Sequence, residues 1–175
     1  MTRKRLWAPW RAPYISHIDP TKNRKCLFCE KARSKQDARN LLIQRGRQAY
    51  SLLNLYPYMN GHSMVVPYRH VGEVEDLTPE EWLDLWRLTA DLIRRMKKVF
   101  APQGFNLGIN LGRAAGAGIP KHLHLHVVPR WRGDANFMST VGNIRVISQS
   151  LRAAHHLLAA ATGRTGEKGR SKRRR

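Results

Sequence analysis

Three histidines alternate with apolar residues between Pro120 and Trp131, and residues of this type at this spacing could do chemistry. They are His122, His124 and His126. Alternation at a period of two is typical of a half-buried β-strand, so we expect the apolar side chains to face the core and the imidazoles to share the other face. At a rise of about 3.3 Å per residue, neighbouring imidazoles should lie roughly 7 Å apart. A neutral imidazole on such a face can attack phosphorus and hold a phosphoryl group covalently.

The two cysteines form a second candidate site. Cys26 and Cys29 have the spacing of a zinc-ligand pair or a redox pair, but one pair is only half of a tetrahedral site. The redox interpretation needs a βαβ context, which the surrounding sequence does not show. A metal site would take its missing ligands from histidines, and two buried thiols without a metal are the alternative.

Polar groups that could bind a ligand lie in two predicted loops. Residues 113–119 are mostly small, and such a loop lets backbone amides approach an anion closely. Its place directly before the histidine strand strengthens this interpretation. Asn54 and His62 stand at the two ends of the loop in a strand-loop-strand, where binding groups are common.

The pattern of apolar residues predicts the strands and helices that must position these side chains. We expect a short helix and turn within 30–40, and a long helix that Thr78 and Glu81 open as a capping box and that ends near Phe100. A last helix should cover 147–161, capped at Ser148. Strands should precede the histidine strand at 41–43, 48–55, 62–67 and 104–111. The predicted fold class is therefore α+β, with a largely antiparallel sheet, one long helix and a C-terminal helix.

Length and composition favour a single domain with a tail. The chain of 175 residues can bury a core of its own. We divide it into an extended arm at 1–24, a domain at 25–162 and a disordered basic tail at 163–175. Trp7 and Trp10 of the arm should pack on the domain or stack on a base.

Hydropathy indicates the compartment of the protein, and charge indicates the class of its partners. No apolar run approaches the ~18 residues of a membrane span, and prolines and Arg11 interrupt the basic N-terminus before a signal-peptide core could form. We therefore expect a cytoplasmic protein with no membrane contact. The formal net charge of +20 attracts polyanions such as nucleotides, RNA or DNA, and a merely solvated tail is the alternative.

The histidine strand resembles the His-x-His-x-His-x-x motif of the histidine-triad (HIT) family, whose members are nucleotide hydrolases and transferases. Segments 54–70 and 104–118 are similar to the nucleoside-binding segment of the family and to the strand and loop before its triad. The opening Leu-Trp-Ala-Pro-Trp-Arg and the later Val-Pro-Arg-Trp resemble the bacterial branch that acts on diadenosine polyphosphates. The likeness covers roughly residues 5 to 160, and it implies the HIT-like fold and a homodimer whose sheets join across the two-fold axis.

The resemblance also implies roles for individual residues. His124 matches the nucleophile, which would attack the α-phosphorus of a dinucleoside polyphosphate such as diadenosine tetraphosphate. The nucleotidyl-histidine would then pass its nucleotide to water or to phosphate. His126 and His62 would contact the transferred phosphate or the leaving group. The substrate-binding residues would be Asn54, Asn110, Gly118 and Trp131.

Two features of this implied site concern the loop and the metal. Gly118 and Ile119 stand where the family usually has a Gln-Ser or Gln-Thr pair, which favours backbone amides as the phosphate contacts. Trp131 would stack on the second base or pack at the edge of the site. The zinc-bearing members of the family imply one structural zinc, and its ligands would be Cys26, Cys29, His70 and His122.

Other functions are compatible with part of the sequence. A non-catalytic nucleic-acid-binding protein would use the basic tail, but it has no need of a nucleophilic imidazole between two others. A nucleotidyl hydrolase acting on adenylated nucleic-acid ends would combine the triad and the tail. A sugar-nucleotide transferase would have Gln where His126 stands. We therefore expect a diadenosine polyphosphate hydrolase or phosphorylase.

Overall fold

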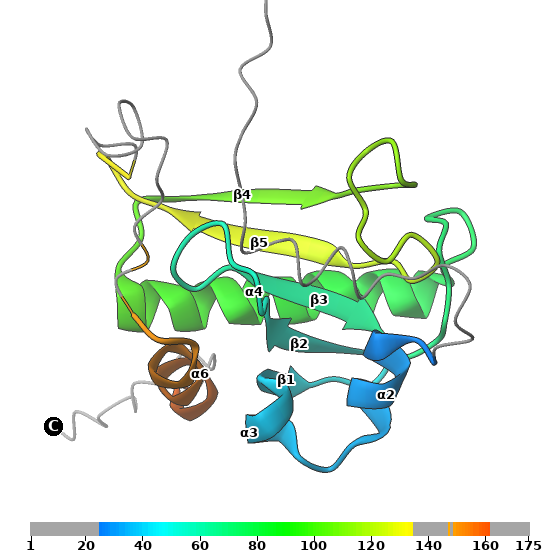
Figure 1. Cartoon of the computed structure of the whole chain (residues 1–175), viewed down its shortest axis with the longest axis horizontal. Coiled ribbons are helices and arrows are strands. Elements are labelled where there is room, and N and C mark those ends of the chain that lie inside the picture. The colour runs from blue at the N-terminus through cyan, green and yellow to red at the C-terminus, as the bar shows by residue number, and fades with distance from the viewer. Residues whose placement is uncertain (1–24, 135–146, 148, 162–175) are drawn as a thin grey trace, which may run out of the picture.

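The computed structural model describes residues 25–134, 147 and 149–161. The expected arm at 1–24, the expected tail at 163–175 and Ser148 lie outside these residues. The described chain forms one antiparallel five-stranded sheet with a long helix along one face (Figure 1). The predicted α+β class is therefore confirmed. The strands are β1 (Leu42–Arg45), β2 (Ala49–Leu53), β3 (Ser63–Pro67), β4 (Gly104–Ile109) and β5 (Leu125–Arg130).

The sheet has the order β1-β2-β3-β5-β4, so the strands that carry the candidate site lie in its middle. Every residue of β2 and β3 is buried, because structure covers both faces of the sheet there. Successive side chains of a strand point to opposite faces. Val65 therefore enters one core, while its neighbours Met64 and Val66 enter another.

The larger core lies between the sheet and helix α4 (Pro79–Phe100). The predicted capping box opens this helix, since the Thr78 hydroxyl accepts from the Glu81 N–H and the Glu81 carboxylate accepts from the Thr78 N–H. Leu85, Leu92 and Met96 recur at helical spacing and are almost fully buried. Full burial of one such side chain stabilises the fold by roughly 1.5–3 kcal/mol.

The C-terminal helix α6 (Leu151–Ala160) begins later than the sequence pattern predicted. Its cap is Ser150, whose hydroxyl accepts from the Ala153 N–H at 3.2 Å, so the predicted cap at Ser148 and start at 147 were wrong. The helix begins where side chains start to reach the core, through Ala154 and Leu158. His155 fastens it to the sheet by donating to the Leu42 carbonyl at 2.6 Å.

The smaller core, on the opposite face, holds helix α2 (Leu27–Arg33) against β2 and β3. Phe28 is the residue of α2 that is buried there. A second short helix, α3 (Asp37–Asn40), leads back into β1. The predicted helix and turn at 30–40 thus become two helices, and the first of them begins directly after Cys26.

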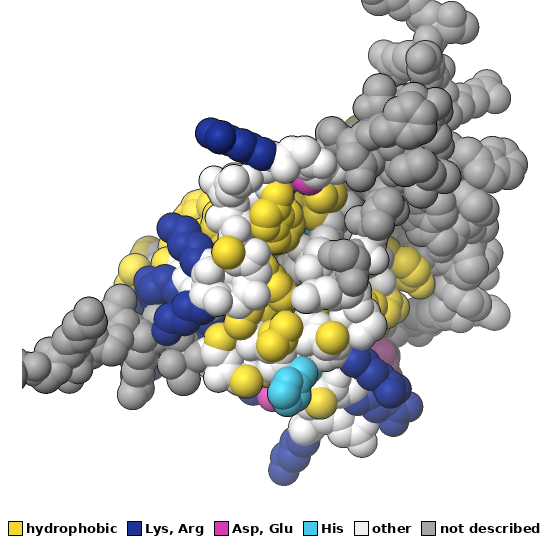
Figure 2. Space-filling model, turned by 90° about the vertical axis from the view of Figure 1, so that its left-hand side faces the viewer, with side chains coloured by type: hydrophobic (Ala, Val, Ile, Leu, Met, Phe, Trp, Pro, Cys, Tyr) yellow, Lys and Arg dark blue, Asp and Glu magenta, His cyan; other side chains and the backbone are white. Residues whose placement is uncertain are grey.

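Positive charge is spread over the body of the molecule. Figure 2 shows the left-hand side of the view in Figure 1, where Lys and Arg side chains surround a central area of hydrophobic ones. Acidic side chains occupy little of this face. None of the helices among the described residues has the length and apolar character needed to cross a membrane.

Candidate active site and metal centre

The triad segment enters the sheet only at its second half. His122 and His124 precede β5, because the Leu123 N–H donates to the Val71 carbonyl at 2.7 Å instead of joining the β3 ladder. The predicted alternation nevertheless holds, since Leu123 and Leu125 belong to the larger core while the imidazoles lie on the opposite side. The ring centroids of His124 and His126 are 4.9 Å apart, closer than the roughly 7 Å expected from strand geometry.

A backbone carbonyl fixes the tautomer of His124. Its Nδ1 lies 2.8 Å from the His122 carbonyl oxygen, which can only accept, so Nδ1 carries the proton. The other ring nitrogen, Nε2, then keeps its lone pair. Because His124 lines a cavity, this arrangement gives a neutral imidazole whose free nitrogen is available to an electrophile.

A second chain of hydrogen bonds fixes the tautomers of His62 and His126. The Tyr58 N–H donates to His62 Nδ1 at 3.0 Å, so the proton of the neutral His62 ring lies on Nε2. This Nε2 is 2.9 Å from His126 Nδ1 and donates to it. The proton of His126 is thereby left on its own Nε2, which makes His126 a hydrogen-bond donor beside His124.

Burial keeps the triad imidazoles neutral. Burial lowers the pKa of His122 to about 4, and it also lowers the pKa of His124. The hydrogen bonds to the Pro67 and His122 carbonyls raise these two pKa values, but burial has the larger effect. Burial and the proximity of His124 lower the pKa of His126 to about 4. An imidazole must be unprotonated to attack phosphorus, so these shifts favour nucleophilic chemistry at neutral pH.

His124 and His126 open into a cavity of about 870 Å³. Helix α2, the end of β2 and residues of the small-residue loop 113–119 all contribute to its lining. The side of α2 that faces the cavity carries side chains at spacings of three and four, as one face of a helix requires. Leu27, Glu30 and Lys31 of α2 and its C-cap Ser34 have this spacing, and Phe28 of α2 also lines the cavity.

The four predicted substrate-binding residues have different positions relative to this cavity. Asn54 and Gly118 line it. Asn110 stands behind the loop, where its Nδ2 would be 3.9 Å from a Cβ placed on Gly116. Trp131 does not belong to the lining, and its indole N–H donates to the Phe100 carbonyl at the end of α4.

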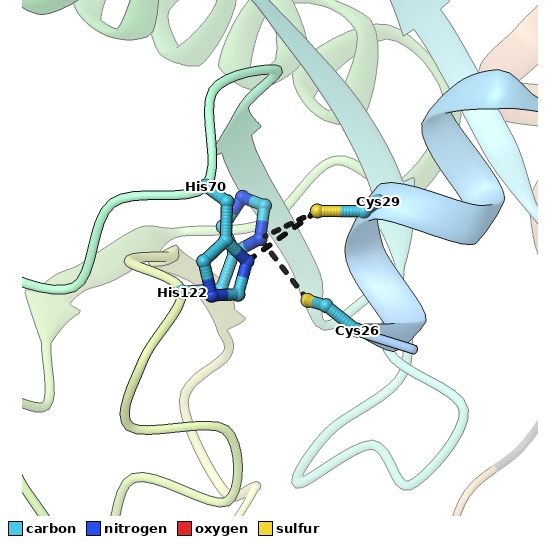
Figure 3. A group of neighbouring side chains, drawn as sticks. All are labelled: Cys26, Cys29, His70 and His122. Carbon is cyan, nitrogen blue, oxygen red and sulfur yellow. Dashed lines mark hydrogen bonds between the residues drawn. The ribbon is translucent and has the colours of Figure 1, made fainter. Parts of the chain in front are cut away.

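The structure brings the four predicted metal ligands together. The ligand atoms of Cys26, Cys29, His70 and His122 all lie within 4.8 Å of one another. Figure 3 shows the two thiols projecting from α2 toward the two imidazoles. The Cys26 and Cys29 Sγ atoms lie 3.2 and 3.6 Å from His122 Nδ1, and Cys29 Sγ lies 3.4 Å from His70 Nδ1.

The surroundings of this cluster fit a tetrahedral metal ion. His122 donates its Nε2–H to the Pro67 carbonyl at 2.9 Å, so its Nδ1 lone pair points at the thiols. Two thiolates and two imidazoles are a common ligand set for structural zinc, and they leave no position open for a substrate. His122 therefore links the Cys/His cluster to the other triad histidines, since its carbonyl also orients His124.

Comparison with known proteins identifies the family. A model of the HIT domain matches residues 34–133. The chain belongs to the HIT domain family. It is 45% identical over 167 residues to the AP-4-A phosphorylase of Mycobacterium tuberculosis, which corresponds to 92% of this chain and 85% of that protein.

Two further comparisons concern a yeast enzyme and a solved structure. The chain is 35% identical over 101 residues to the asymmetrical bis(5'-nucleosyl)-tetraphosphatase of Schizosaccharomyces pombe, or 58% of this chain and 55% of that protein. A zinc-bound histidine triad family protein from Mycobacterium smegmatis superimposes with a TM-score of 0.62 at 26% identity. That comparison covers 78% of this chain and 91% of the other. Fold and family thus agree with the predicted HIT-like architecture.

Sequence reasoning missed several residues that shape the HIT site. Phe28 packs between the two sites, with its ring centroid 5.4 Å from that of His122 and 5.1 Å from that of His124. Tyr58 supplies the backbone N–H that orients His62. Lys31 and Arg113 are the lining residues that carry positive charge. Only Phe28 had a signal in the sequence, since it stands between the two cysteines.

Proposed function

We propose that this protein cleaves dinucleoside polyphosphates such as diadenosine tetraphosphate through a nucleotidyl-histidine on His124. The observation that carries the proposal is the unprotonated Nε2 of His124, held toward a cavity by the bond from Nδ1 to the His122 carbonyl. The AP-4-A phosphorylase relative supports the choice of substrate.

In the first step, the Nε2 lone pair attacks the α-phosphorus, and the bond from that phosphorus to the bridging oxygen breaks. The departing nucleotide keeps the electron pair of this bond, so diadenosine tetraphosphate releases ATP. The imidazole becomes positively charged, and its Nδ1–H bond to the His122 carbonyl becomes a stronger, charge-assisted bond. The intermediate is therefore stabilised without a further proton transfer.

His126 and His62 assist this first step. The Nε2–H of His126 donates to an oxygen of the transferred phosphate or to the leaving oxygen, where negative charge develops. The 2.9 Å bond from His62 holds His126 in the tautomer that can donate. In the second step, an oxygen of water or of inorganic phosphate attacks the same phosphorus and releases His124, giving AMP or ADP respectively.

The nucleoside would bind beside the phosphate, between α2 and the end of β2. Phe28 and Leu53 offer apolar surfaces for a base, and Asn54 offers an amide to the ribose hydroxyls. Gly118 would present backbone amides to the phosphate, and Asn110 would support that loop. Trp131 would act at the edge of the site, toward the second nucleotide.

A zinc ion held by Cys26, Cys29, His70 and His122 would have a structural role. It would fasten α2, which forms one cavity wall, to the segment that carries the triad. The zinc-bound relative supports the identity of the metal. The chemistry would remain with the imidazoles, since all four ligand positions are taken by side chains.

The proposed assembly is a homodimer of the 25–162 domain in the cytoplasm. Edge strand β4 supports it, because Asn106, Leu107 and Gly108 are exposed there and could extend the sheet into a partner. Nucleic-acid binding through the tail, with or without catalysis, is the second hypothesis, and no contact among the described residues favours it over nucleotide cleavage.

The decisive experiment incubates the purified full chain with diadenosine tetraphosphate, with and without inorganic phosphate. We expect ATP plus ADP from phosphorolysis, or ATP plus AMP from hydrolysis. His124→Ala should lower turnover by several orders of magnitude, as loss of a covalent nucleophile commonly does, while nucleotide binding persists. No cleavage by the wild-type chain, or near-normal turnover by the variant, would contradict the proposal.

A further inference from the structure

The cavity described above has an uneven distribution of positive charge. Among its lining residues, only Lys31 and Arg113 are lysine or arginine. Lys31 lies on α2, is half-buried, and donates from Nζ to the Asn40 carbonyl at 2.9 Å. Its place beside Leu27 and Phe28 is at the nucleoside end of the cavity.

Arg113 belongs to the loop 113–119, a segment of the lining separate from α2. It is exposed, as are the residues that follow it up to Gly116, whereas Ala117 is buried and anchors the loop. The turn is held by hydrogen bonds from the Gly116 N–H to the Arg113 carbonyl at 3.0 Å and from the Ala117 N–H to the Gly112 carbonyl at 3.2 Å. The main chain at Arg113 is therefore held by this turn, while the exposed side chain remains accessible to a ligand in the cavity that Arg113 lines.

The proposed substrate needs a positive group at this place. Once a nucleoside occupies the α2 side and its α-phosphate reaches His124, the rest of the polyphosphate would extend away from α2, toward the loop that carries Arg113. Each phosphate of that chain carries negative charge, and the charge increases at the leaving oxygen as the bond breaks. A guanidinium suits this task, because its planar fork can donate two parallel hydrogen bonds to phosphate oxygens.

We propose that Arg113 binds the polyphosphate leaving group and thereby selects dinucleoside polyphosphates over nucleotide esters whose leaving group has no phosphate. This inference rests on the proposed function and adds a specificity-determining residue to it. Arg113 would act on the leaving group alone, whereas Lys31 and Asn54 would contact the nucleoside that all these substrates share.

The test compares two substrates on the full chain: diadenosine tetraphosphate and an adenosine 5'-phosphate aryl ester. Arg113→Ala should lower kcat/KM for diadenosine tetraphosphate about 10-fold to 100-fold, the usual range for one charged hydrogen-bonding group, and leave kcat/KM for the ester unchanged. Arg113→Lys should recover part of the loss, since an ammonium keeps the charge without the fork. The matched control is Arg87→Ala, an exposed arginine on α4, which packs against the other face of the sheet.

The outcomes separate this inference from the proposed function. If the wild-type chain does not cleave diadenosine tetraphosphate, the proposed function fails, and the inference that rests on it fails too. If the wild-type chain cleaves it but Arg113→Ala changes both substrates equally, the residue only shapes the loop and the inference is overturned. No change with either substrate would overturn it as well.

Discussion

Main-chain groups set the tautomers of His62, His122 and His124, and His62 in turn sets that of His126. The His122 carbonyl accepts from His124, the Pro67 carbonyl accepts from His122, and the Tyr58 N–H donates to His62. A carbonyl can only accept and an amide N–H can only donate, so each contact fixes one tautomer. The tautomer of His124, the proposed nucleophile, is thus set by a carbonyl, unlike a triad in which an acid orients the histidine.

His126 should make the stability of the fold depend on pH. Its pKa is about 4 in the folded chain and 6.5 ordinarily, so the unfolded chain binds a proton that the folded chain does not accept between these values. The contribution of His126 is complete above pH 6.5 and is lost as the pH falls toward 4. We expect the free energy of unfolding, measured by urea titration, to decrease as the pH is lowered across this window.

Two variants separate the contribution of His126 to this pH dependence from that of other groups. His126→Gln should weaken the pH dependence, because one shifted group has been removed. His156→Gln, which changes an exposed side chain of α6, should keep it. If His126→Gln unfolds with the pH dependence of the wild type, the neutral state of His126 does not contribute to stability.

At this scale the sequence predicted which histidines share a face but not how closely they meet. Alternation placed His124 and His126 together, and the backbone repeat suggested a spacing of roughly 7 Å. The rings approach to 4.9 Å because His124 lies outside the ladder and its ring is drawn toward the His122 carbonyl. The contact between His62 and His126 depends on the pairing of β3 with β5, which no local pattern reveals.

Helix α2 depends on its surroundings more than on its own sequence. Seven residues are too few for an isolated helix to be stable in water. Its first turn carries Cys26 and Cys29, the Tyr50 hydroxyl donates to the Phe28 carbonyl at 2.8 Å, and Arg45 donates to the carbonyls of Ala32 and Ser34 at 2.8 and 2.6 Å. The position of one cavity wall therefore depends on the Cys/His cluster at one end and on Arg45 at the other.

Loss of one thiol should loosen this wall. In the wild-type chain, purified without chelator, we expect elemental analysis to give near one zinc per chain. Cys26→Ser should lose the metal and lower Tm by about 5 °C or more, since each 1 kcal/mol corresponds to about 2–4 °C in a chain of this size. KM for diadenosine tetraphosphate should rise more than kcat falls, because in the proposed mechanism the metal would support the binding wall while the imidazoles would do the chemistry.

Lys35→Ser, an exposed change just after α2, is the control and should retain both zinc and Tm. Wild-type protein that is metal-free and fully folded would contradict the structural role. A Cys26→Ser variant with unchanged zinc content would remove Cys26 from the ligand set.

The sequence predicted the helix start that is defined by a local interaction. Thr78 and Glu81 gave the start of α4 because a capping box is a local interaction. The start of α6 was misjudged, since Ser148 and Ser150 are equivalent as caps until packing decides where the helix begins. The start of α2 was also missed, because its helical state depends on partners distant in sequence, such as Tyr50 and Arg45.

The whole domain uses the two faces of its sheet for different purposes. One face packs on α4 and α6 and forms the larger core, and the other holds α2, the metal ligands and the cavity. The sequence predicted the sheet and the long helix from their periodicities. It did not predict which face receives the cysteine helix, because residues 26–33 have too short a pattern to define a face.

The basic segment 163–175 should be dispensable for catalysis, since the cavity, the triad and the metal cluster are complete within residues 25–134. The segment lies outside the described residues, and its composition of basic and small residues offers little apolar surface to bury. We expect a chain that ends at Thr162 to keep its turnover of diadenosine tetraphosphate at moderate salt. RNA affinity of the full chain should fall on truncation and fall steeply with salt, because it would depend on released counterions.

Steady-state kinetics and salt titrations of RNA binding, each on both chain lengths, test these two expectations. Lost catalysis in a folded truncated chain would assign the segment to the active site, and unchanged RNA binding would assign the affinity to the basic surface of the domain.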